Sequence, residues 1–162
     1  MKYNPAFLSD QELIDTFAVR ERELDSILEV LRENTGRSNQ HVLVIGPRGI
    51  GKTTLVRRAA AEVRRDAELK EKWYPLVYAE ESYRVSTPGE FWLEGILHLA
   101  EQTKDPAWQR SYEELRQERD EQRLCEKALS RLLDFADGQG KRILLIVENL
   151  NMLFQDQMDE QA

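Results

Sequence analysis

Residues 46–53 constrain this 162-residue chain more than any other segment, because they read Gly-Pro-Arg-Gly-Ile-Gly-Lys-Thr and fit the pattern G-x-x-x-x-G-K-[ST]. A chance match anywhere in a chain of this composition is expected about once in a thousand. The apolar, β-branched run 41–45 precedes the motif, and helical periodicity follows it from Gly51 to about Leu69. The sequence therefore predicts a buried parallel strand, a phosphate-binding loop and a helix, in that order.

Each residue type in this loop has a chemical reason. The glycines let the backbone curl so that its amides face phosphate oxygens, and the helix that follows adds the positive end of its dipole. Lys52 is expected to contact the β- and γ-phosphates, and Thr53 to ligate a Mg²⁺ ion that bridges them. Arg48 either touches the nucleotide or is a solvated side chain, and the sequence leaves both readings open. The candidate nucleotide-binding residues of the loop are Gly46, Pro47, Arg48, Gly49, Ile50, Gly51, Lys52, Thr53 and Thr54.

Glu148 directly follows the most apolar strand candidate of the chain, Arg142–Val147. In nucleotide hydrolases with such a loop, an acid at the carboxyl end of a neighbouring strand holds the metal. If Glu148 has that role, Asn149 stands where a glutamate would polarise the attacking water, and hydrolysis is slow because an amide cannot accept a proton. If Glu148 is instead the base, Val147 stands at the metal position. The candidate catalytic residues are Lys52, Glu148 and Asn149, and the candidate metal ligands are Thr53 and Glu148.

Strand and helix signals alternate along the chain, which indicates an α/β fold with a mostly parallel sheet. Capping signals precede two of the helices, at Thr87 with Glu90 and at Asp105. The stretch 116–123 has no apolar residue and is expected to project into solvent or to break the helix that contains it. The expected helices cover about residues 9–17, 20–34, 51–69, the segment that starts at 87, and 105–136, and the expected strands cover 41–45, 73–79 and 142–147.

Composition excludes several classes of function. The net charge is −7, so no global positive field attracts nucleic acid or an anionic membrane. No apolar run approaches the ~20 residues of a membrane span, and no apolar signal segment begins the chain, so we expect a cytoplasmic protein without membrane contact. The single cysteine, Cys125, can form neither an internal disulfide nor a thiolate metal cluster, which excludes redox and zinc chemistry.

Three segments, residues 17–24, 46–54 and 143–149, together resemble the AAA+ and STAND-type P-loop ATPases, in particular the branch with origin-recognition and archaeal ATPases. The resemblance implies bound ATP or ADP with Mg²⁺, and a parallel sheet flanked by helices. It also implies that Phe17, Val19 and Arg20 lie near the adenine, with Val19 in place of the family's usual glycine. The run 148–151 looks like the Asp-Asn-Leu-Asp ending of several such ATPases, which favours Glu148 as the metal ligand.

The resemblance also implies a division of residues 1–162 as a partial ATPase domain that is truncated after the Walker B strand. We expect N-terminal helices in residues 1–40, a strand-loop-helix-strand unit in 41–80, a helical insertion in 87–137 and the Walker B strand in 142–149. The insertion explains why Lys52 and Glu148 lie 96 positions apart, which is long for this family. The family's polar sensor, arginine finger and helical lid are expected in further sequence.

Strand order in the family is 5-1-4-3-2, so the strand 41–45 and the strand 142–147 are not neighbours there. We therefore expect either a gap that other polypeptide fills, or a rearranged sheet in which these two strands pair directly, because open apolar edges invite aggregation.

The leading functional hypothesis is ATP binding with Mg²⁺-dependent hydrolysis, used as a nucleotide switch on a protein partner or on DNA. The alternative is a nucleotide-binding interaction scaffold with little or no turnover. GTP is disfavoured because no Asn-Lys-x-Asp segment occurs, whereas a small-molecule kinase shares the loop but has no recognisable acceptor site. The partners expected are the nucleotide and a protein partner or further copies of the chain, with DNA only through domains outside this sequence.

Overall fold

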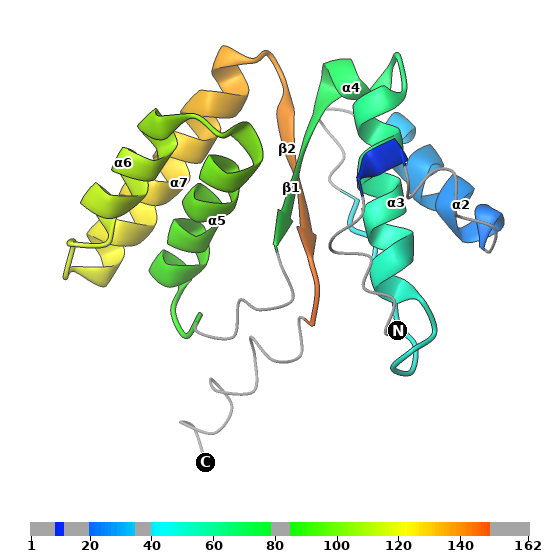
Figure 1. The fold of residues 1–162 in the computed structure, drawn as a ribbon, viewed down its shortest axis with the longest axis horizontal. Coiled ribbons are helices and arrows are strands. Elements are labelled where there is room, and N and C mark those ends of the chain that lie inside the picture. Colours follow the sequence, from blue (N-terminus) through cyan, green and yellow to red (C-terminus); the bar gives the residue numbers. More distant parts are fainter. Residues whose placement is uncertain (1–8, 12–19, 35–39, 79–84, 150–162) are drawn as a thin grey trace. The chain divides into compact units, whose positions relative to one another are not determined.

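The computed structural model describes residues 9–11, 20–34, 40–78 and 85–149 (Figure 1). The chain divides into two compact units, Met1–Pro75 and Leu76–Ala162, so the boundary falls within strand β1 (Trp73–Tyr78). None of the helices in the described ranges is both long and apolar enough to cross a lipid bilayer.

Helices α2 (Glu21–Glu33) and α3 (Lys52–Arg65) pack together in the first unit (Figure 1). The buried residues of α2 are Leu24, Leu28 and Leu31. Together with Ile27 they follow the i, i+3, i+4, i+7 spacing that is typical of an amphipathic helix. The indole of Trp73 adds to this core and donates from Nε1 to the Leu31 carbonyl oxygen across 3.1 Å. The predicted helix over residues 20–34 is therefore confirmed, whereas of the one predicted over 9–17 only residues 9–11 are described.

Helix α3 ends earlier than predicted. The periodicity predicted a helix to about Leu69, but α3 stops at Arg65 and the four-residue helix α4 (Leu69–Lys72) follows. Asp66 breaks the helix, because its backbone is extended and its carboxylate accepts from the amides of Glu68 (3.0 Å) and Leu69 (2.9 Å). A side chain that captures nearby amides in this way competes with the helical hydrogen bonds.

The strand predicted for residues 41–45 is not formed, and this prediction is wrong. Val42, Leu43 and Ile45 are exposed to 47%, 70% and 84%. A strand exists only by pairing, and among the described residues the sheet consists of β1 and β2 (Arg142–Val147) alone. The direct pairing of residues 41–45 with β2 that a rearranged sheet requires is therefore absent from the described part of the chain.

The two strands that do form lie side by side and parallel (Figure 1). They confirm the predicted strands 142–147 and 73–79, apart from Ala79, which lies outside the described residues. Pro75 lies within β1 and has no N–H to donate, which suits a strand at the edge of a sheet.

The second unit contains three helices side by side, α5 (Pro88–Thr103), α6 (Pro106–Leu115) and α7 (Glu121–Gly138) (Figure 1). The predicted caps are confirmed, since Thr87 accepts from the Glu90 amide at 3.2 Å and Asp105 from the Ala107 amide at 2.8 Å. The predicted helix 105–136 is broken at residues 116–120, within the stretch that lacks apolar side chains, and Asp120 caps the new helix α7.

Tyr78 at the end of β1 anchors α5 within this unit. Its hydroxyl donates to the Phe91 carbonyl oxygen at 2.9 Å, and its ring stacks on that of Phe91 with centroids 4.8 Å apart. Burial raises the pKa of Tyr78, and the nearby Glu94 carboxylate raises it further, so the phenol stays protonated. Gly95 leaves the room for this contact, since a Cβ there would lie 2.5 Å from the Tyr78 hydroxyl oxygen.

One carboxylate joins the N-termini of α5 and α7. Glu121, in the first turn of α7, accepts from the Gly89 amide at 2.6 Å and from the Thr87 hydroxyl at 2.9 Å. Both helix ends carry partial positive charge, so an acid between them is favourable. The contact fixes α5 relative to α7.

Candidate functional site

The loop at residues 46–53 has the backbone that its glycines predict. Gly49 and Gly51 lie in the left-handed region, with φ of 83° and 88°, where other residues except asparagine and aspartate are strained. Gly51 is the N-cap of α3, and its carbonyl oxygen accepts from the Leu55 amide at 3.0 Å. The loop therefore turns tightly and opens directly into the helix.

The side chain of Lys52 folds back onto the start of this loop. Its Nζ donates to the carbonyl oxygens of Gly46 at 2.6 Å and Pro47 at 2.8 Å. An ammonium group has three N–H donors, so one remains after these two bonds for a further acceptor such as a phosphate oxygen. A Cβ at Gly46 would lie 3.1 Å from Cγ2 of Ile50, so a larger residue there would crowd the loop.

The first turn of α3 suits an anion. It contains no acidic residue, and it carries Thr53 and Thr54, both half-buried, directly after Lys52. The orphan amides and the positive end of the dipole at such a helix start favour negative charge. The neighbouring positions 47–50 are exposed, so the loop is open to solvent. Arg48 is among them, and both of its predicted roles stay predictions.

Glu148 lies directly after β2, at the carboxyl end of a strand that is parallel to β1, as the sequence predicted. Its side chain is half-buried, whereas the next residue, Asn149, is exposed. Glu148 belongs to the second unit and the loop to the first. The joint action of Thr53 and Glu148 on one metal ion therefore stays a prediction.

The predicted adenine segment is described in part. Phe17 and Val19 lie outside the described residues. Arg20 is described as the N-cap of α2, with a left-handed backbone at φ 71° and ψ 37°. Its role at the nucleotide stays a prediction.

The left-handed backbone at Asn149, with φ of 53°, is a feature of the candidate site that sequence reasoning missed. The one available signal was the residue type, because asparagine and aspartate enter this conformation more readily than other residues with a side chain. From the sequence alone, Asn149 is interpreted only as an amide in place of an acid.

Among the described residues, no group of three or more His, Cys, Asp or Glu side chains is arranged to hold a metal ion. A Mg²⁺ ion that arrives with a nucleotide needs fewer protein ligands, since it takes phosphate oxygens and keeps several waters. One hydroxyl and one carboxylate, the chemistry of Thr53 and Glu148, fit that requirement.

The chain was also compared with known protein families, curated proteins and solved structures. The profile of the AAA ATPase domain family matches residues 16–161, which is most of the chain. The chain therefore belongs to the AAA ATPase domain family, and this membership supports nucleotide binding. Comparisons with curated proteins and with solved structures gave no match.

Proposed function

We propose that this chain binds ATP and ADP with Mg²⁺ through residues 46–54 and works as a nucleotide switch of the origin-recognition and archaeal-ATPase type. The observation that carries the proposal is the closed loop, in which Lys52 donates to the Gly46 and Pro47 carbonyl oxygens beside two left-handed glycines. Such a loop presents backbone amides and one ammonium N–H to the same anion. Membership of the AAA ATPase domain family supports the same conclusion.

The proposed roles follow from the chemistry of each group. Lys52 binds the β- and γ-phosphates, and the amides of the loop bind phosphate oxygens along it. The Thr53 hydroxyl and the Glu148 carboxylate hold Mg²⁺, which when bound neutralises charge on the phosphates. Phe17, Val19 and Arg20 contact the base. A change at the γ-phosphate then alters what the domain presents to a protein partner, to further copies of the chain or, through other domains, to DNA.

A second candidate function is a nucleotide-dependent scaffold with little turnover. Asn149 favours it, because an amide after the metal-binding acid cannot take a proton from water. Steady-state phosphate release from the 162-residue chain separates the two functions. Turnover far above the rate of the Lys52→Ala variant supports the switch, and equal rates support the scaffold.

Calorimetry on the 162-residue chain tests nucleotide binding itself. We expect Mg²⁺-dependent binding of ATP and ADP, little binding of GTP, and a loss of about 1.5–3 kcal/mol of ATP binding free energy in Lys52→Ala, since a charge-assisted phosphate contact is removed. Lys70→Ala is the matched control, because Lys70 is an exposed lysine of the short helix α4 in the same unit. Equal affinity of wild type and Lys52→Ala for ATP would refute the role of Lys52.

A further inference from the structure

Ile50 is an apolar residue of the phosphate-binding loop, and its side chain is 40% exposed. This side chain lies on Gly46, four residues earlier in the same loop. A Cβ added to Gly46 would lie 3.1 Å from Cγ2 and 3.8 Å from Cδ1 of Ile50. A single exposed apolar residue needs no explanation by itself, but this one connects the middle of the loop to its start.

The stem of Lys52 lies beside the same contact. Its Cδ would be 3.9 Å from the Cβ added to Gly46, and its ammonium group donates to the carbonyl oxygens of Gly46 and Pro47. The methylene groups of a lysine pack on apolar surface while the charged end keeps its polar partners. The start of the loop is therefore held by two residues, by polar bonds from Lys52 and by an apolar contact from Ile50.

The backbone on both sides of Ile50 has few side-chain contacts to fix it. Gly49 and Gly51 are both left-handed, with φ of 83° and 88°. Among the described residues, no heavy atom beyond the chain neighbours lies within 4 Å of a Cβ added to either glycine. Glycine has more conformational freedom to lose than any other residue, so a loop with two of them gains from a further restraint. Isoleucine suits that task, because its branched Cβ restricts χ1.

We infer that Ile50 is a positioning residue of the nucleotide site: packed on Gly46, its side chain holds the loop in the binding conformation before a phosphate arrives. This inference rests on the proposed nucleotide binding by residues 46–54. A loop that is already ordered loses less conformational entropy on binding, so its order adds to the affinity. Ile50 thus acts through Gly46 and not through the nucleotide.

Calorimetry with MgATP on the 162-residue chain measures this contribution. Ile50→Ala removes Cγ2 and Cδ1, and we expect it to weaken ATP binding about tenfold. Ile50→Val keeps Cγ2 and the branched Cβ, so it should bind ATP within about twofold of the wild type. Because the side chain is 40% exposed, Ile50→Ala should shift the thermal midpoint by less than about 2 °C.

Val42→Ala is the matched control for Ile50→Ala. Val42 is also a β-branched residue of the first unit, its exposure of 47% is similar, and it lies outside the loop. We expect this variant to bind ATP like the wild type.

A double-mutant cycle with Gly46→Ala tests whether Ile50 acts through Gly46. Gly46 is not among the glycines with positive φ, so its backbone accepts alanine. The added Cβ meets Cγ2 of Ile50 in the wild type but not in Ile50→Ala. We expect Gly46→Ala to weaken ATP binding severalfold in the wild type and by less than about twofold in the Ile50→Ala background. A direct contact between Ile50 and the nucleotide would give the same factor in both backgrounds.

The nucleotide-free chain provides a readout that does not depend on binding. Relaxation of the ¹⁵N nuclei gives the order parameters of the Gly49 and Gly51 amides, which are about 0.85 for a rigid backbone and below about 0.6 for a flexible one. We expect Ile50→Ala to lower both values, whereas Ile50→Val and Val42→Ala should keep those of the wild type.

Each other outcome has a defined meaning. Wild-type affinity for ATP in Ile50→Ala overturns the inference and leaves the nucleotide site intact, and so does a loss in Ile50→Val as large as in Ile50→Ala. Unchanged order parameters in Ile50→Ala, or an equal effect of Gly46→Ala in both backgrounds, overturn it as well. A wild-type chain that does not bind ATP refutes the proposed function itself, and the order parameters then still decide whether Ile50 holds the loop.

Discussion

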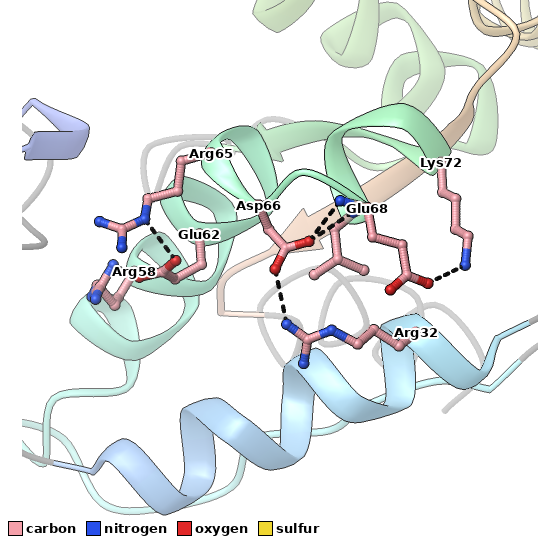
Figure 2. A network of polar contacts seen from close by, with 8 residues as sticks. Arg32, Arg58, Glu62, Arg65, Asp66, Glu68 and Lys72 are labelled. Carbon is pink, nitrogen blue, oxygen red and sulfur yellow. Dashed lines mark hydrogen bonds and ion pairs between the residues drawn. The ribbon is translucent and has the colours of Figure 1, made fainter.

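Arg32 donates from Nη2 to Oδ2 of Asp66 across 2.9 Å, and this bond joins the last turn of α2 to the turn between α3 and α4 (Figure 2). Figure 2 also shows that the Asp66 carboxylate accepts hydrogen bonds from the amides of Glu68 and Leu69 at the start of α4. The side chain of Asp66 therefore connects α2, the end of α3 and α4 in the first unit. Other ion pairs lie nearby in the sequence. Lys72 pairs with Glu68 after this turn, and Glu62 pairs with both Arg58 and Arg65 on α3 before it.

The first prediction concerns the pH dependence of stability that Asp66 causes. The bond from the Leu69 amide, and then the bond from Arg32, lower the pKa of this carboxyl below its usual range. When the pKa of a carboxyl is lower in the folded chain than in the unfolded chain, its ionised form stabilises the fold. This stabilisation is fully present at pH values above the pKa of the unfolded state, about 4, and is lost as the pH falls through the pKa of the folded state. We expect Asp66→Ala to cost about 1–2 kcal/mol at pH 7, and less as the pH falls below 4.

Urea unfolding of both proteins at pH 7 and at a series of acidic pH values checks this. The control is Glu113→Ala, which removes an exposed carboxylate that pairs with Arg116 on the surface and is expected to change stability by less than about 0.5 kcal/mol. A cost for Asp66→Ala that does not depend on pH would mean that the ionised carboxylate is not the stabilising form.

The second prediction concerns the contact between Gly95 and Tyr78. A Cβ at position 95 would lie 2.5 Å from the Tyr78 hydroxyl oxygen and 3.1 Å from Cδ1 of Leu132. Although alanine is the better helix former by about 1 kcal/mol, we expect Gly95→Ala to destabilise the chain by about 1–2 kcal/mol, because overpacking costs more. Gly138→Ala, at the end of α7 with nothing within 4 Å of the added Cβ, should be neutral or stabilising.

A double-mutant cycle with Tyr78→Phe assigns this cost to the hydroxyl group. Removing the hydroxyl should make Gly95→Ala less costly than in the wild type. If the cost of Gly95→Ala were the same in both backgrounds, the clash would lie elsewhere, for instance at Leu132.

Local sequence signals predicted the elements that depend on local physics. The 3.6-residue spacing of Leu24, Leu28 and Leu31 located α2, and the caps Thr87 and Asp105 located α5 and α6, because a cap acts within one turn. The phosphate-binding loop followed from its glycines in the same way.

The features that the sequence did not predict depend on interaction partners or on backbone geometry. Residues 41–45 have the composition of a buried strand, but strand formation requires a neighbour that the composition does not reveal. The end of α3 depends on Asp66, whose carboxylate captures two amides instead of leaving them to the helix. The left-handed backbone at Asn149 involves a single residue, so no periodic pattern in the sequence predicts it.

The third prediction follows from the exposure of residues 41–45. Leu43 is 70% exposed, so Leu43→Ala removes little buried surface and should change the free energy of unfolding by less than about 0.5 kcal/mol. Leu55, one turn into α3, is 1% exposed, and Leu55→Ala should cost about 2–5 kcal/mol. Denaturant titrations of the two variants compare these costs. A large cost at Leu43 would show that residues 41–45 pack as a strand in solution.

The last prediction separates the two roles of Glu148. As a metal ligand, its carboxylate strengthens ATP binding only when Mg²⁺ is present, so Glu148→Gln should weaken MgATP binding about tenfold and leave binding in EDTA unchanged. Glutamine keeps the size of the side chain, and Glu126→Gln on the exposed face of α7 is the matched control for the loss of one charge. Calorimetry in both buffers, together with phosphate release, gives the comparison. If Glu148→Gln bound MgATP like the wild type but lost all hydrolysis, Glu148 would be the base that activates water, and the metal would depend on Thr53, the phosphates and water.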